Sequence, residues 1–268
     1  MKMITRKQIK NIGLQITGKS ILLCTLTLAL VYGCNSENVS DCLQNAGDII
    51  TEEIVVEPFT TITIFENSAL VIKEGPVQKV EVETGEYLRN DIDAKVVDGK
   101  LLLTNTNGCN FTRDYGLTTF YVTAPNITSI RSSTGFDISS DGILSYPNLS
   151  LLSEDFGDSE ADFTTGSFDL ELSGTRVSLV SNGAAYFKLK GTAESLNVVF
   201  AAGDSRLNAE NLIAKTVSVN HRSSNDMLVN PEESISGTIR GVGDVISFNK
   251  PNVVNVEELY KGKLIFKE

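Results

Sequence analysis

The stretch Ala202-Gly203-Asp204-Ser205-Arg206-Leu207-Asn208-Ala209 contains the two elements that recur through the second half of the chain. A small polar turn comes first, and a short segment of alternating polar and apolar residues follows it. Alternation with a period of two predicts a β-strand that is buried on one face only. One such short unit cannot bury its own apolar side chains, so the pattern predicts units that stack on one another.

The turn recurs at intervals of 22, 26, 20, 22 and 18 residues, at Gly135, Gly157, Gly183, Gly203, Asn225 and Gly243. Periods near 20 with β-type sequence predict the stacked rungs of a β-solenoid over residues 126–250. The uneven spacing favours an irregular right-handed β-helix over a strict short repeat. An up-and-down barrel is the alternative, because regular strands joined by turns also suit that fold. Alternate residues are expected to point inward, for example Leu170, Leu172, Val217 and Val219.

The sequence of residues 48–125 predicts strands and a hairpin that are less regular than the rungs. Residues 48–268 together are expected to form one all-β domain. Asp98-Gly99 lies between two apolar runs, and this dipeptide is typical of a type I′ hairpin turn. All six prolines lie where the apolar runs end. They are therefore expected at strand boundaries, where a missing N–H removes no hydrogen bond from the sheet.

The N-terminus reads as an export signal. A 12-residue apolar run, Ile21–Tyr32, follows five basic residues and precedes Gly33-Cys34. The run is too short to span a membrane, which takes about 20 residues, so residues 1–33 predict a signal peptide. Gly33-Cys34 resembles a bacterial lipobox. That resemblance implies a lipoprotein carrying an acyl chain such as palmitate on Cys34, followed by a tether over residues 34–47. Asn35 after the cysteine favours the outer membrane, with the domain facing the periplasm or the cell surface.

Two cysteines remain once Cys24 leaves with the signal and Cys34 carries the lipid. An exported compartment permits disulfides, so Cys42 and Cys109 are predicted to pair. The mature chain carries 18 Lys and Arg against 34 Asp and Glu, a net charge of −16. This charge excludes nucleic acid as a partner, because binding it requires cationic side chains against phosphate. Contact with the membrane is expected only through the lipid on Cys34.

The acidic residues beside the turns are the strongest candidates for metal binding or catalysis: Asp137, Asp158, Asp204, Asp226 and Asp244. Stacked carboxylates suit Ca²⁺, but the strict glycine-rich calcium repeat is absent. Asp after Gly also commonly satisfies turn backbone groups. We therefore expect no metal site, with Asp158, Asp204, Asp226 and Asp244 as weak candidates. The alternative is that two of the same acids serve a glycoside-cleaving enzyme, which needs two carboxyl groups about 5–9 Å apart.

The only histidine, His221, precedes Arg-Ser-Ser without the Gly-x-Ser-x-Gly elbow of a serine hydrolase. It is expected at a surface strand end. Four aromatic residues surround Cys109. They are candidates for a sugar-stacking platform, and the alternative is that they cover the end of the β core: Phe111, Tyr115, Phe120 and Tyr121.

Several landmarks together carry a family resemblance: Phe59-Thr-Thr-Ile-Thr-Ile64, Leu70-Val-Ile-Lys-Glu-Gly75-Pro-Val-Gln-Lys-Val-Glu-Val82, Val97-Asp-Gly-Lys-Leu-Leu-Leu103, Val122-Thr-Ala-Pro-Asn-Ile-Thr-Ser-Ile130 and the serial turns. They resemble the family described as "putative auto-transporter adhesin, head GIN domain". The resemblance covers roughly residues 48–250. It implies an all-β, β-helix-like domain of exported Bacteroidetes-type lipoproteins, often with a cysteine pair placed like Cys42 and Cys109. It supplies no catalytic residues.

The sequence thus predicts a non-catalytic lipoprotein of the cell envelope, adhesin-like or ligand-binding, with a glycan or another protein as partner and no cofactor. One alternative is a carbohydrate-active β-helix enzyme that uses the rung carboxylates. A second alternative is a component of envelope stress signalling.

Overall fold

The computed structural model describes residues 41–111, 113–156 and 163–267. The predicted signal peptide and the predicted lipid site, Cys34, lie outside these residues. Within them, no helix has the length and apolar character needed to cross a membrane. The helical elements of these described ranges are two short 3-10 helices, η1 (Asp41–Leu43) and η2 (Glu86–Asp91). All other regular secondary structure in the described part is β-strand, which confirms the predicted all-β fold class.

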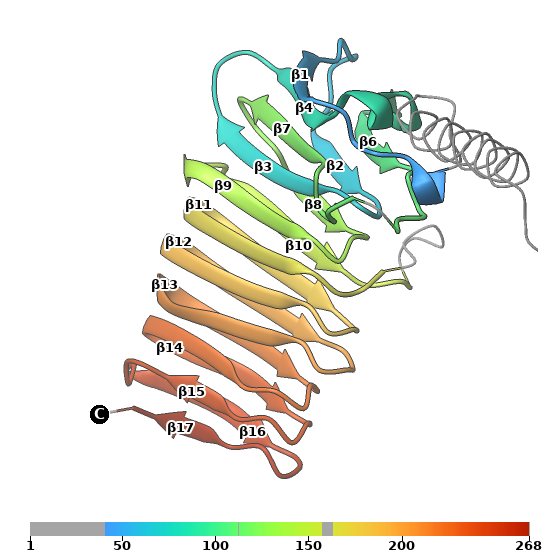
Figure 1. The fold of residues 1–268 in the computed structure, drawn as a ribbon. Coiled ribbons are helices and arrows are strands. Elements are labelled where there is room, and N and C mark those ends of the chain that lie inside the picture. Colours follow the sequence, from blue (N-terminus) through green and yellow to red (C-terminus); the bar gives the residue numbers. More distant parts are fainter. Residues whose placement is uncertain (1–40, 112, 157–162, 268) are drawn as a thin grey trace, which may run out of the picture.

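The strands of the N-terminal part are short: β1 (Ile49–Glu53), β2 (Thr61–Ile64), β3 (Ala69–Glu74), β4 (Lys79–Gly85), β5 (Ile92–Val97), β6 (Lys100–Asn105), β7 (Thr119–Ala124) and β8 (Ser129–Ser132). The antiparallel pairs all lie here and join β1 to β4, β4 to β7 and β5 to β6. Figure 1 shows these strands at one end of the molecule.

From β9 onward the strands stack along the molecule toward the C-terminus (Figure 1). They are β9 (Asp137–Leu144), β10 (Asn148–Ser153), β11 (Ser167–Ser181), β12 (Tyr186–Phe200), β13 (Arg206–His221), β14 (Met227–Ile239), β15 (Val245–Ser247), β16 (Val253–Glu258) and β17 (Leu264–Phe266). Each described pairing between two of these strands is parallel. From β11 onward, partner residues are 17 to 21 positions apart in the chain.

Each long strand takes part in two ladders. The first half of β11 pairs with β9, and its second half pairs with β10. At the other end, the two halves of β14 pair with β15 and β16. We call the ladder formed by β9, the first halves of β11 to β14, β15 and β17 the first ladder. The ladder formed by β10, the second halves of β11 to β14 and β16 is the second ladder. A rung is one strand from each ladder plus the turn that follows.

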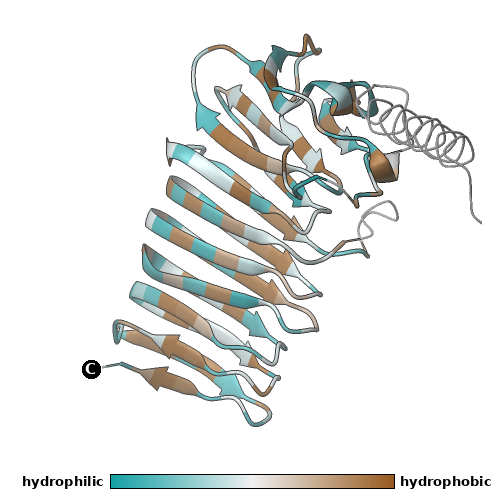
Figure 2. Cartoon of the chain, in the orientation of Figure 1, coloured by the Kyte–Doolittle hydropathy of each residue, from teal (hydrophilic) through white to brown (hydrophobic). Residues whose placement is uncertain are grey.

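The core lies between the two ladders. Phe187 in the first half of β12 stacks on Phe200 in its second half, with ring centroids 5.8 Å apart. Apolar and polar residues alternate along the long strands, as the bands in Figure 2 show. The inward positions predicted from this alternation are confirmed, because Leu170, Leu172, Val217 and Val219 are all buried. Parallel stacking places equivalent apolar residues of successive rungs on top of one another, so each rung covers the next.

One turn prediction is confirmed and one proline prediction is wrong. Asp98 and Gly99 both have positive φ, 50° and 75°, and connect the antiparallel strands β5 and β6, as a type I′ turn requires.

Pro231, by contrast, lies inside β14 rather than at its end. The register between β13 and β14 shifts on both sides of the Ala214–Pro231 pair. Such irregularities are places where a strand tolerates the missing N–H of proline.

The expectation of a surface strand end for His221 is confirmed in one part, because His221 is the last residue of β13, and is wrong in the other, because its side chain is fully buried. Its register partners are Phe200 on one rung and Ile239 on the next, so it occupies an inward row of the second ladder. Its ring lies 6.2 Å from that of Phe200. Burial lowers the pKa of His221, opposed by the backbone of Gly243 and by the carboxylates of Asp226 and Asp244.

His221 therefore predicts a pH-dependent stability. A histidine with a lowered pKa in the folded state stays neutral there while the unfolded chain takes up a proton below about pH 6.5. The contribution of neutral His221 to the free energy of unfolding is therefore complete above about pH 6.5. It is lost as the pH falls from there through the lower pKa of the folded state. The free energy of unfolding should fall less between pH 7.5 and pH 5 in His221→Phe than in the wild type. Urea unfolding at both pH values measures this, and equal falls in the two proteins would contradict it.

Candidate functional site

The turn acids hold neighbouring rungs together. One carboxylate oxygen of Asp226 accepts the backbone N–H of Asp244 at 2.8 Å, and Asp244 in turn accepts that of Lys263 at 2.8 Å. Asp204 accepts a hydrogen bond from the Ser224 hydroxyl. Asp158 lies outside the described residues. In the described part of the chain, no three His, Cys, Asp or Glu side chains come together as a metal site. The arrangement of these acids therefore fits turn stabilisation.

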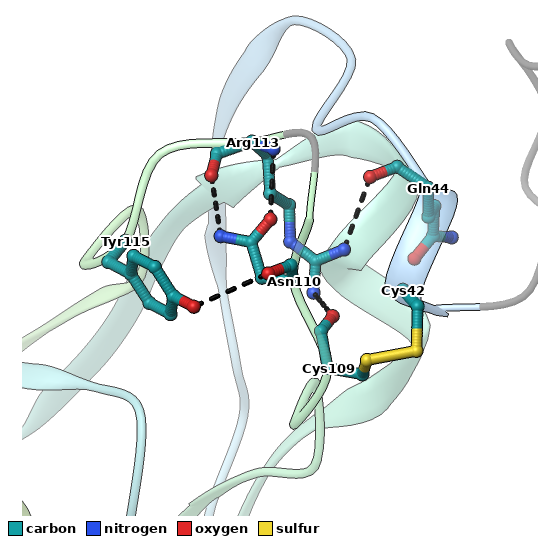
Figure 3. The surroundings of a disulfide bond; sticks show 6 residues. All are labelled: Cys42, Gln44, Cys109, Asn110, Arg113 and Tyr115. Carbon is teal, nitrogen blue, oxygen red and sulfur yellow. Dashed lines mark hydrogen bonds between the residues drawn. A yellow bond between two sulfur atoms is a disulfide. The ribbon is translucent and has the colours of Figure 1, made fainter.

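A second candidate site is the loop that contains Cys109. Cys109 forms the predicted disulfide with Cys42, which joins the start of the described chain to the segment after β6 (Figure 3). The backbone N–H of Phe111 donates to the Cys42 carbonyl at 3.0 Å. The loop is thus attached to Cys42, which lies 67 positions before Cys109 in the sequence, by a covalent bond and a backbone hydrogen bond.

Arg113 organises the same loop. Its guanidinium donates to the carbonyl of Gln44 at 3.2 Å and to that of Cys109 at 3.1 Å (Figure 3). Its backbone N–H donates to the Asn110 side chain at 2.9 Å. The sequence analysis did not single out Arg113. No local signal marks it, because its partner Gln44 lies 69 residues away in the chain.

The structure divides the four aromatic residues around Cys109 into two kinds. Phe120 is fully buried and Tyr121 is half-buried in β7, so these two belong to the sheet. Phe111 and Tyr115 are 79% and 76% exposed. The Tyr115 hydroxyl donates to the carbonyl of Asn110 at 3.3 Å. Two exposed aromatic side chains on a constrained loop are suited to contact a ligand, because less conformational entropy is lost on binding.

The chain belongs to the family described as "Putative auto-transporter adhesin, head GIN domain", whose model matches residues 58–251. This confirms the resemblance seen in the sequence. Comparison of the sequence with curated proteins finds no match.

Three solved structures show the same fold at low sequence identity. A putative adhesin from Bacteroides fragilis has a TM-score of 0.72 and 20% identity, covering 83% of this chain and 99% of its own. A putative lipid binding protein from Parabacteroides distasonis has a TM-score of 0.58 and 15% identity, over 83% and 98% of the two chains. A putative adhesin from Parabacteroides merdae has a TM-score of 0.56 and 13% identity, over 83% and 97%. None of these names is that of an enzyme.

The disulfide gives a prediction for stability. Replacing both Cys42 and Cys109 by Ser should lower the free energy of unfolding by roughly 4 kcal/mol, the chain-entropy value for a closed loop of this length. Urea unfolding of the purified variant measures the loss. Intact mass after alkylation, with and without reduction, checks that the wild-type protein holds the bond. Two free thiols in wild-type protein taken from the cell envelope would contradict the pairing.

Proposed function

We propose that the chain is a non-catalytic, adhesin-like lipoprotein of the cell envelope that binds a glycan or protein ligand through the disulfide-linked loop. The observation that carries this proposal is the exposure of Phe111 and Tyr115 on a loop held by a disulfide and by Arg113. Aromatic side chains supply much of the binding energy in protein interfaces and lose few rotamers on contact. Membership of a family described as adhesins supports the same role.

The proposal includes the cellular setting. Residues 1–33 act as a lipoprotein signal peptide, Cys34 carries the lipid, and residues 34–47 link it to the domain. The destination is the outer membrane, with the domain facing the periplasm or the surface. The support is the basic leader, the 12-residue apolar run and Gly33-Cys34 together.

The proposal also includes the winding of the chain. Residues 126–250 wind as a right-handed β-helix, and residues 48–125 form the irregular part that precedes it. The support is parallel pairing of strands 17 to 21 residues apart, together with the strong preference of parallel connections for right-handed crossovers. Parallel pairing distinguishes these rungs from an up-and-down barrel, whose neighbouring strands are antiparallel.

The anchor is tested by Cys34→Ala in the native host. The variant should lose metabolic labelling with palmitate and should leave the membrane fraction, because the thiol that accepts the lipid is gone. Cys24→Ala is the matched control and should keep both properties. Unchanged labelling and fractionation of Cys34→Ala would refute the lipoprotein assignment.

The binding loop is tested with the double variant Phe111→Ala, Tyr115→Ala. On arrays of glycans, polysaccharides and immobilised mucin and collagen, the wild type should be retained without cleavage, and the double variant should lose at least tenfold in retention. Tyr260→Ala removes an aromatic ring that is 58% exposed elsewhere and should bind like the wild type.

Three results on these arrays would contradict the proposal. They are release of cleavage products, retention of the double variant at the wild-type level on every surface that retains the wild type, and absence of retention on every surface. Equal melting temperatures of the three proteins ensure that lost retention reflects lost contacts rather than unfolding.

A further inference from the structure

Facing charges on the outer surface of the rungs form ion pairs. Asp169 and Lys188 are register partners on β11 and β12, and their charged atoms lie 2.7 Å apart. Glu171 and Lys190 are the next such partners, at 2.9 Å. Glu194 and Lys215 form the equivalent contact between β12 and β13 at 2.7 Å. Opposite charges on adjacent rungs therefore meet where the register places them side by side.

Arg206 and Asp226 depart from this pattern. Leu207 is the register partner of Met227, so the preceding residues, Arg206 and Asp226, face each other on adjacent rungs. The described structure has no ion pair between them. Arg206 instead places its guanidinium carbon 5.5 Å from the ring centroid of Tyr186, on the rung before. One oxygen of Asp226 accepts the Asp244 N–H, and the other makes no hydrogen bond within the described part of the chain.

The space between the separated charges is a hollow of about 340 Å³. Besides Arg206 and Asp226, the polar lining includes the side chain of Asn208. The amide oxygen of Asn208 accepts the N–H of Glu210 at 3.3 Å, which leaves its NH₂ group to donate. Half-buried Leu228 and Tyr186 add apolar surface. The hollow thus combines an exposed guanidinium, the amide donor of Asn208, an exposed carboxylate and an apolar wall at a volume typical of small-ligand sites.

The chemistry of these groups selects hydroxyl-rich ligands. A guanidinium only donates hydrogen bonds, and an ionised carboxylate only accepts them. An anionic ligand would satisfy Arg206 but meet the like charge of Asp226, and a cationic ligand would have the reverse problem. Neutral hydroxyl groups both donate and accept, so adjacent hydroxyls of one sugar satisfy both side chains without an unpaired charge.

We propose that this hollow binds a sugar residue of a neutral glycan, whose adjacent hydroxyl groups bridge Arg206 and Asp226. This site rests on the proposed ligand-binding role but uses different residues, on the repeating rungs rather than on the disulfide-linked loop. It is a non-covalent site, and no bond is made or broken in it.

The test uses the full-length chain in detergent on an array of neutral, uronate-containing and amino-sugar-containing oligosaccharides. A retained neutral oligosaccharide is then titrated by calorimetry. Arg206→Ala and Asp226→Asn should each weaken its binding at least tenfold. Asp226→Asn keeps an amide oxygen to accept the Asp244 N–H, so the turn is preserved. Lys215→Ala, which breaks the ion pair with Glu194 away from the hollow, is the matched control and should bind like the wild type.

The remaining outcomes decide against the hollow, and some of them leave the proposed loop site standing. Retention of uronate oligosaccharides alone, or wild-type affinity in either hollow variant, would overturn the site. Absence of oligosaccharide retention would also overturn it, whereas the proposed function is still supported if mucin or collagen is retained through Phe111 and Tyr115. Loss of neutral-glycan retention in the Phe111, Tyr115 double variant, with wild-type affinity in the hollow variants, would refute this inference and support the loop.

Discussion

The parallel pairing of each strand with a segment about 20 residues further along the chain is the constraint on which the rest of the structure depends. Parallel neighbours need a long connection between them. Here that connection is the other half of the rung, which belongs to the second ladder. Two ladders therefore form from one chain, and the apolar faces of both are buried against each other. A residue in an inward row is covered by its equivalents on the rungs before and after it, which explains why His221 is buried between Phe200 and Ile239.

The same stacking organises the surface. Turn acids such as Asp226 and Asp244 accept backbone N–H groups of the next rung, and facing charges such as Asp169 and Lys188 pair across rungs. The carboxylates that suggested stacked metal ligands in the sequence therefore accept hydrogen bonds that stabilise the turns. The disulfide-linked loop lies between β6 and β7, away from the long strands β11 to β14. Its order comes instead from Cys42 and Arg113, which leaves Phe111 and Tyr115 exposed.

Sequence patterns correctly predicted the features that depend on residue type and on neighbours in the sequence. Alternation predicted the strands and the inward residues, Asp98-Gly99 predicted its hairpin, and the cysteine count predicted the Cys42–Cys109 disulfide. Register was not accessible in this way, because it depends on residues about 20 positions apart. Pro231 was therefore misplaced at a strand end and His221 at the surface. For the same reason, neither the contact of Arg113 with Gln44 nor the open pair of Arg206 and Asp226 was visible in the sequence.

Deletion of one rung tests this account most directly. Removing residues 186–205 joins Ala185 to Arg206, and Arg206 is the register partner of the deleted Tyr186. The inward rows then continue from β11 to β13, with the one-residue register shift that β13 already has against β12. The account predicts a folded protein that unfolds cooperatively in urea, with a denaturant slope slightly reduced because less surface is exposed on unfolding. Removing residues 186–195, half a rung, should abolish cooperative unfolding, because the first and second ladders fall out of register. Equal behaviour of the two deletions, or loss of cooperative unfolding in the full-rung deletion, would contradict the account.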